Sequence, residues 1–158
     1  MTRGIRRFWV LSGVTVCAVL VGPIAAAQAS NNTLRATLNS YSAKIVKDEN
    51  AVKNGLAGYP QGKVKPLIHA LTTEIRDLHA LRSKLAHDSA SSAKGAKAKT
   101  EIVRGLGLIA NAYGALRHDV LLAHGGPVPR DQVAAAVNTD KKGRAKLLAG
   151  LSLLNHAG

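Results

Sequence analysis

The sequence predicts an all-α fold, an antiparallel (up-down-up-down) four-helix bundle that follows a cleaved signal peptide. Apolar residues recur at three- and four-residue steps in four blocks, and no stretch alternates apolar with polar residues as a strand would. Connections rich in Gly, Pro or Ser separate the blocks. Because an amphipathic helix buries its apolar stripe only against other elements, four helices packed together are the economical arrangement.

The N-terminal segment has the order of residues that is typical of a secretory signal. Three arginines open the chain, an apolar run covers residues 8–27, and small residues stand at Ala27 and Ala29. Signal peptidase accepts small residues at these two positions before the cut. We therefore expect cleavage after Ala29, with residues 1–29 as the signal peptide and residues 30–158 as one helical domain.

The export route and the fate of this segment each have an alternative. Arg6 and Arg7 followed by apolar residues fit a loose twin-arginine pattern, but Ile5 stands where that pattern prefers Ser or Thr, so we favour Sec export. The composition is typical of bacteria, and the expected location is secreted, periplasmic or at the cell envelope. The alternative is an uncleaved membrane anchor, because the apolar run approaches the roughly 20 residues of a spanning helix.

The first two helices are expected over residues 33–57 and 63–87. Asn31 or Asn32 can cap the start of the first, because a short polar side chain accepts bonds from the free N–H groups of the first turn. The second has the clearest apolar stripe of the chain, and Pro66 is tolerated in its first turn.

The last two helices are expected over residues 92–124 and 130–155. A serine among residues 89–92 can cap the third helix, and the Gly- and Pro-rich residues 125–129 end it. Residues 138–143 resemble a turn, which leaves two alternatives for the fourth helix, a continuous one and an interrupted one.

Two acidic residues continue the apolar stripe of the first helix. Asp48 and Glu49 follow Ile45 at the three- and four-residue steps. We expect one of them to be partly buried and to pair with a lysine of a neighbouring helix.

The domain after the signal peptide is strongly basic. It keeps all nine acidic residues and all 22 Lys and Arg residues except Arg3, Arg6 and Arg7. Such a charge attracts nucleic acid, anionic wall polymers or acidic lipid head groups, although exposed lysines also keep a helical bundle soluble. The basic residues form two groups, which are Lys94, Lys97 and Lys99 in the first and Lys141, Lys142, Arg144 and Lys146 in the second.

We expect these two groups to face an anionic partner, either a polymer or lipid head groups. The first group lies at the start of the third helix, where the helix dipole disfavours cations, so something other than local helix stability selects it. Sequence-specific binding of nucleic acid is not expected, because the chain has no helix-turn-helix spacing and no tyrosines among the lysines.

Small residues line one flank of the third helix. Gly107, Ala110 and Gly114 are spaced three and four residues apart, which lets another helix approach closely. Close packing inside the bundle is one interpretation, and self-association or binding of a protein partner is the other.

The domain lacks the residue patterns of enzymes and of metal or cofactor proteins. The only Cys lies in the signal peptide, no Glu is followed by His three residues later, and no two of the six histidines are four residues apart. We therefore expect a non-enzymatic binding or accessory protein of the envelope, with no cofactor and no metal. The favoured alternative is a carrier of a small apolar ligand, and a metal- or haem-binding bundle is less favoured. The tunnel of such a carrier would be lined by Leu71, Ile75, Ile109 and Leu116.

Overall fold

The computed structural model describes residues 31–157, in which four long helices pack together without any strand. The helices are α2 (Asn32–Gly58), α3 (Val64–His87), α4 (Ala93–Leu122) and α5 (Arg130–Asn155), with a short 3-10 helix, η2 (Tyr59–Gln61), after α2. The prediction of an all-α fold with four packed helices is confirmed. The expected signal peptide, with Ala27 and Ala29, lies outside the described residues. No described helix is both long and apolar enough to span a membrane.

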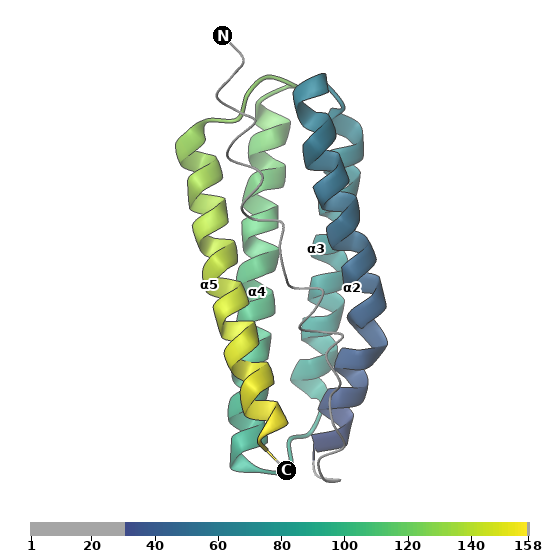
Figure 1. The fold of residues 1–158 in the computed structure, drawn as a ribbon, viewed down its shortest axis with the longest axis vertical. Coiled ribbons are helices and arrows are strands. Elements are labelled where there is room, and N and C mark those ends of the chain that lie inside the picture. Colours follow the sequence, from purple (N-terminus) through teal and green to yellow (C-terminus); the bar gives the residue numbers. More distant parts are fainter. Residues whose placement is uncertain (1–30, 158) are drawn as a thin grey trace.

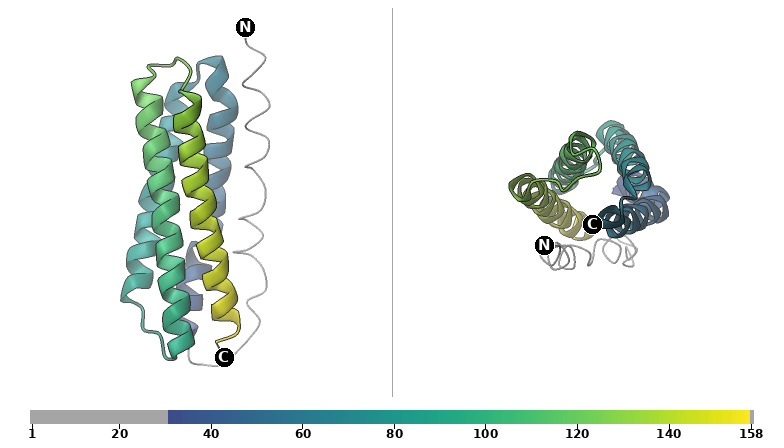
Figure 2. Two further views of the ribbon diagram at one scale, coloured as in Figure 1. Left: turned by 90° about the vertical axis from the view of Figure 1, so that its left-hand side faces the viewer. Right: turned by 90° about the horizontal axis from the view of Figure 1, so that it is seen from above.

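The four helices lie side by side as two pairs (Figures 1 and 2). The closest packing joins α4 to α5, while α3 packs against both α2 and α4. Direct contact between α2 and α5 is sparse. The end of α5 lies at the same end of the bundle as the first turns of α2 and α4 (Figure 1).

Polar side chains join the elements at this end. Ser92 caps α4, because its Oγ accepts a hydrogen bond from the N–H of Gly95 at 3.0 Å, which confirms the expected serine cap. Asn31 precedes α2, but its side chain makes no capping bond. Its Nδ2 instead donates to the carbonyl oxygen of Ala157 at 2.9 Å and thereby ties the start of α2 to the end of α5.

The close approach of α4 and α5 depends on small residues at seven-residue intervals. These are Ala98, Gly105 and Ala112 in α4, and Ala136, Gly143, Gly150 and Ala157 in and just after α5. A Cβ atom added to Gly143 would lie 2.8 Å from the carbonyl oxygen of Gly105, and one added to Gly105 would lie 2.6 Å from the backbone nitrogen of Leu147. The two backbones are therefore in direct contact. The helix α5 is continuous, so the alternative of a break at residues 138–143 is wrong.

Replacing Gly143 by alanine is expected to lower the free energy of unfolding. Alanine favours a helix over glycine by about 1 kcal/mol, but overpacking a tight interface costs about 1–3 kcal/mol. The clashing atoms at Gly143 include backbone atoms of α4, which cannot move separately from the helix, so we expect a net loss. The measurement is urea unfolding followed by helical circular dichroism.

Gly114→Ala is the matched control for this change. Its added Cβ meets no atom within 4 Å, so this variant should gain most of the helix propensity and become more stable. Equal stabilisation of both variants would contradict backbone contact between α4 and α5.

Candidate functional site

A layer of polar side chains divides the apolar core into two parts. The larger part includes Ile45, Leu78 and Ile109, and the smaller part includes Leu71 and Leu116. Between these parts, each helix places polar residues on its apolar stripe. These are Asp48 and Glu49 of α2, Glu74 and Asp77 of α3, Tyr113 of α4, and Asp140 and Arg144 of α5. We call these residues the polar layer.

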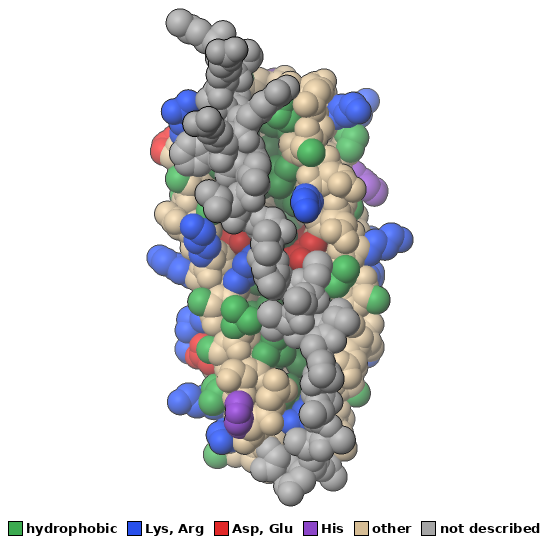
Figure 3. All heavy atoms as spheres, viewed as in Figure 1, with side chains coloured by type: hydrophobic (Ala, Val, Ile, Leu, Met, Phe, Trp, Pro, Cys, Tyr) green, Lys and Arg blue, Asp and Glu red, His purple; other side chains and the backbone are tan. Residues whose placement is uncertain are grey.

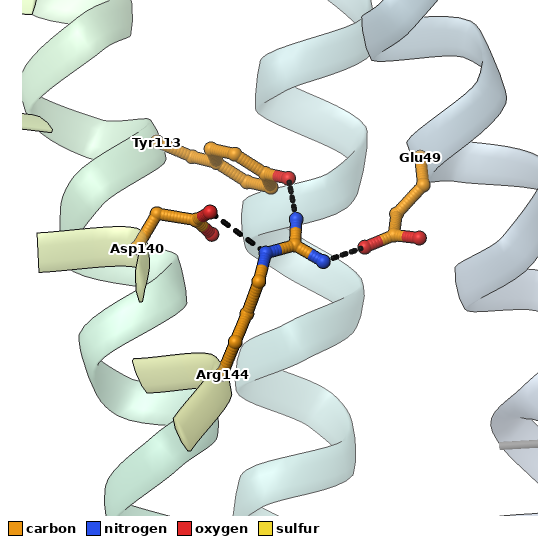
Figure 4. Close-up of polar contacts among 4 residues, drawn as sticks. All are labelled: Glu49, Tyr113, Asp140 and Arg144. Atoms are coloured by element: carbon orange, nitrogen blue, oxygen red, sulfur yellow. Dashed lines mark hydrogen bonds and ion pairs between the residues drawn. The ribbon is translucent and has the colours of Figure 1, made fainter. Parts of the chain in front are cut away.

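Arg144 donates hydrogen bonds to three other residues of the polar layer (Figure 4). Its Nε donates to Oδ2 of Asp140 at 2.7 Å, its Nη1 to Oε1 of Glu49 at 3.1 Å, and its Nη2 to the hydroxyl oxygen of Tyr113 at 3.1 Å. The planar guanidinium thus satisfies two carboxylates and a phenol at once, which a lysine could not do in the same geometry. Arg144 links α5 to α2 at this level, and Arg35 of α2 links them again nearer the end of α5, where its Nη2 donates to the carbonyl oxygen of Leu154 at 2.6 Å.

The layer reaches solvent on the side between α2 and α5. The side chains of Arg144, Glu49 and Asp140 are 21%, 14% and 13% exposed. Figure 3 shows acidic side chains midway along this face, between the helices labelled α5 and α2 in Figure 1. The layer is therefore buried on its inner side and borders water at its outer edge.

Glu74 occupies the inner side of the layer. It is 1% exposed, and neither of its carboxyl oxygens has a hydrogen-bond partner in the part of the chain that the structure describes. Burial raises the pKa of Glu74 to about 9, and the neighbouring carboxyls of Glu49, Asp48 and Asp77 raise it too, while Arg144 opposes them. Glu74 is therefore protonated and uncharged at neutral pH.

Asp77 and Asp48 form an acidic pair beside Glu74. Lys44 Nζ lies 3.1 Å and Arg76 Nε lies 3.0 Å from Oδ1 of Asp77. Burial alone would raise the pKa of Asp77, but hydrogen bonds from Arg76, Asp48 and Lys44 outweigh it and lower the pKa to about 2. Burial and the neighbouring Asp77 raise the pKa of Asp48, whose Oδ2 has no hydrogen-bond partner among the described residues.

The outcome for Asp48 and Glu49 is mixed. Asp48 is buried, as their position on the stripe predicts. The partner of Glu49, however, is Arg144 of α5, where we expected a lysine. The arginine fork suits this position because it serves several acceptors at once.

Two lysines of the first basic group bind the ends of neighbouring helices. Lys94 Nζ donates to the carbonyl oxygen of His156 at 3.0 Å, just after α5. Lys99 Nζ donates to the carbonyl oxygens of Ala86 and Asp88, each at 2.7 Å, at the end of α3. Lysines satisfy the free carbonyls and the negative dipole of a helix C-terminus. Their unfavourable place in the first turns of α4 thus has a structural reason.

The second basic group is divided between the interior and the surface. Arg144 belongs to the polar layer, and Lys146 Nζ pairs with Oε2 of Glu101 at 2.9 Å. Lys97 of the first group, together with Lys141 and Lys142, is exposed and has no hydrogen bond or ion pair with the described residues. Within the two basic groups, these three lysines have the charges that are most available to a partner.

The flank of small residues points largely into the bundle. Gly107 and Ala110 are buried, and a Cβ added to Gly107 would meet the side chain of Arg82 on α3 at 3.4 Å. Gly114 has open space beside it. Close packing explains Gly107 and Ala110, and self-association through this flank stays a prediction.

The residues of the expected apolar tunnel are not one continuous surface. Leu71 and Leu116 belong to the smaller core, Ile109 belongs to the larger one, and Ile75 is half-buried. The polar layer lies between them, so an apolar ligand there would have to pass carboxyl groups. An apolar carrier stays an alternative that no structural observation favours.

Most of the polar layer was not predicted from the sequence, although the sequence carries a signal for it. Asp140 and Arg144 lie on the stripe that runs through Leu147 and Leu151 at three- and four-residue steps. Glu74 lies three residues after Leu71 and four before Leu78 in the same way. Polar residues on an apolar stripe therefore mark the layer. Among the described residues, no group of three or more His, Cys, Asp or Glu side chains is arranged to hold a metal ion.

The chain was compared with family models, with curated proteins and with solved structures. None of the three comparisons found a match.

Proposed function

We propose that the chain is an exported, non-enzymatic, antiparallel four-helix bundle that binds anionic polymers or acidic lipid head groups through its basic surface. The antiparallel arrangement is supported by the contacts of α4 with α5, because Gly105 approaches Gly143 while Ala98 approaches Gly150. Contacting residues whose numbers rise in one helix and fall in the other are typical of antiparallel neighbours.

The separation of charge between interior and surface supports the binding role. Of the nine acidic residues, five lie in the polar layer. The remaining acids are Asp88, Glu101, Asp119 and Asp131, of which Asp131 is exposed. Most lysines and arginines are exposed, and they protrude along the edges of the face in Figure 3. The surface is therefore more basic than the composition suggests, and it can attract a polyanion over about 8–10 Å at physiological salt.

Binding is expected to weaken steeply as salt rises. The experiment measures binding of the purified protein to duplex DNA, to an anionic wall polymer and to acidic vesicles across a salt series. Each phosphate contact on duplex DNA contributes about −0.9 to the slope of log affinity against log salt. The triple variant Lys97→Gln, Lys141→Gln, Lys142→Gln should therefore reduce the size of that slope by up to about 3 on DNA.

A second triple variant, Lys63→Gln, Lys65→Gln, Lys84→Gln, is the matched control, because it removes the same charge from other exposed positions. A smaller effect of this control supports the assignment to α4 and α5, and an equal effect contradicts it. Negligible binding of the unchanged protein to all three partners at low salt would refute the proposed function.

A further inference from the structure

We propose that the polar layer is a binding site for a small organic cation with two or more N–H donors, such as a primary diamine or a guanidine. The layer places five carboxyl groups from three helices around one buried level of the bundle. Among the described residues, Arg144 inside the layer and Lys44 and Arg76 at Asp77 lie within ion-pair distance of them. The carboxyl groups thus outnumber these cations.

Hydrogen-bond acceptors without donors indicate what the layer lacks. Both oxygens of Glu74, Oδ2 of Asp48 and Oδ1 of Asp140 are buried and have no hydrogen-bond partner among residues 31–157. A buried polar atom without a partner costs about 1–3 kcal/mol, so native proteins keep such atoms rarely. All four atoms can accept a hydrogen bond once Glu74 is ionised, so a ligand that ionises Glu74 and completes the layer must bring donors.

The chemistry of the layer favours a nitrogen cation over other ligands. Carboxyl groups repel anions, and an apolar ligand would leave the same oxygens unsatisfied. The described residues offer no group of side chains arranged to hold a metal ion. A guanidinium already fits at this level, because Arg144 donates to three different helix positions there.

The layer is accessible from one side. Arg144, Glu49 and Asp140 form its partly exposed edge between α2 and α5, and Glu74 forms its inner end. These three side chains are partly exposed whereas Glu74, Asp77 and Asp48 are buried, so this edge is the natural entrance. A ligand entering there would pass Arg144 and reach the unpartnered oxygens behind it.

Binding of a cation should displace a proton from Glu74. The charged and titratable groups around Glu74 are Asp48 and Glu49 from α2, Asp77 from α3, Tyr113 from α4, and Asp140 and Arg144 from α5. Arg144 is the group that lowers the pKa of Glu74, and a bound ammonium would add a second positive charge with the same effect. The carboxylic acid then ionises, the ammonium ion pairs with the carboxylate, and the proton passes to the buffer.

The test is calorimetric titration of the purified protein at pH 7 with 1,4-diaminobutane and with methylguanidine, in two buffers of different ionisation enthalpy. We expect binding that releases up to one proton per ligand. Glu74→Gln keeps the shape of the side chain but cannot ionise, so it should weaken binding at least about tenfold, which is 1.4 kcal/mol, and abolish proton release. Asp131→Asn, which removes an exposed acid from the start of α5, is the control and should bind as the unchanged protein does.

Three results would overturn the proposal. The first is no binding of either probe by the folded protein at millimolar concentrations, and the second is undiminished binding by Glu74→Gln. The third is binding of Mg²⁺, Ca²⁺ or Zn²⁺ at Glu74 without binding of the amines, which would make the ligand a metal ion and not an organic cation. If Glu74→Gln fails to fold, the proton count of the unchanged protein decides, because binding without proton release contradicts ionisation of Glu74. None of these outcomes depends on binding of polyanions at the surface.

Discussion

Replacing Arg144 by methionine is expected to lower the free energy of unfolding by about 3 kcal/mol, since removing one partner of a buried ion pair typically costs about 3–5 kcal/mol. Methionine keeps much of the length of the side chain but leaves Glu49, Asp140 and Tyr113 without their common donor. The effect should lie at the lower end of the range, because the side chain of Arg144 is 21% exposed and water can partly replace it. The measurement is urea unfolding at pH 7 followed by circular dichroism.

Two further variants separate the charge of Arg144 from its geometry. Lys142→Met removes an exposed charge from the same helix and should change stability little. Arg144→Lys keeps the charge but loses the planar fork, so its stability should lie between those of the methionine variant and the unchanged protein. If Arg144→Met were as stable as the unchanged protein, Arg144 would not be the group that holds α5 to α2 at this level.

The helices could be predicted because their signal is local. In α3, Leu67, Leu71, Leu78, Leu81 and Leu85 recur at helical spacing, and all of them are buried. The same rule extends to Asp48 and Glu49, which continue the stripe of α2 and of which one was expected to be partly buried; Asp48 is the buried one. What sequence periodicity gives is the face of a helix on which a residue lies.

The partners of these residues could not be predicted in the same way, because they lie on other helices. Lys94 and Lys99 occupy an unfavourable local position, and the carbonyl groups that explain it follow α5 and end α3. Arg144 was grouped with Lys141 and Lys142 by sequence proximity. Its position three residues before Leu147, on the apolar stripe, is the better indicator that it points inward.

Glycine was misjudged for a related reason. The residues around Gly143 resemble a turn when they are considered alone, since glycine is unfavourable inside a helix by about 1 kcal/mol relative to alanine. The contact with Gly105 offsets this disadvantage, because it brings two helix backbones together. The seven-residue spacing of Gly143 and Gly150, matched by Ala98 and Gly105, is the pattern that identifies such packing in a sequence.

Replacing Glu74 by glutamine is expected to make the protein more stable above neutral pH. The folded protein holds the proton of Glu74 up to a pKa of about 9, whereas the unfolded chain releases it near 4.5. Between these values the folded state binds more protons than the unfolded state, so the free energy of unfolding falls as pH rises, by at most about 1.36 kcal/mol per pH unit. The stabilising contribution of the protonated group is complete below the unfolded pKa and is lost as the pH rises to about 9.

At pH 7, this penalty amounts to an upper limit of about 3 kcal/mol, and Glu74→Gln should recover most of it because glutamine does not ionise. The two proteins should approach equal stability near pH 4.5 and diverge steadily toward pH 9. The measurement is a series of urea unfolding curves of both proteins between these two pH values. The difference in the free energy of unfolding between the two proteins isolates the contribution of Glu74 from those of other titrating groups.

Glu101→Gln is the control with the opposite sign. The hydrogen bond from Lys146 lowers the pKa of Glu101, so its ionised form stabilises the fold, and the loss of that form should reduce stability at neutral pH. If the stability difference between Glu74→Gln and the unchanged protein did not vary with pH, Glu74 would be ionised in the folded state and would have a partner. A protein that keeps an acid here at the expense of stability is expected to use it, and the organic cation proposed for the polar layer is the use that its unpartnered oxygens favour.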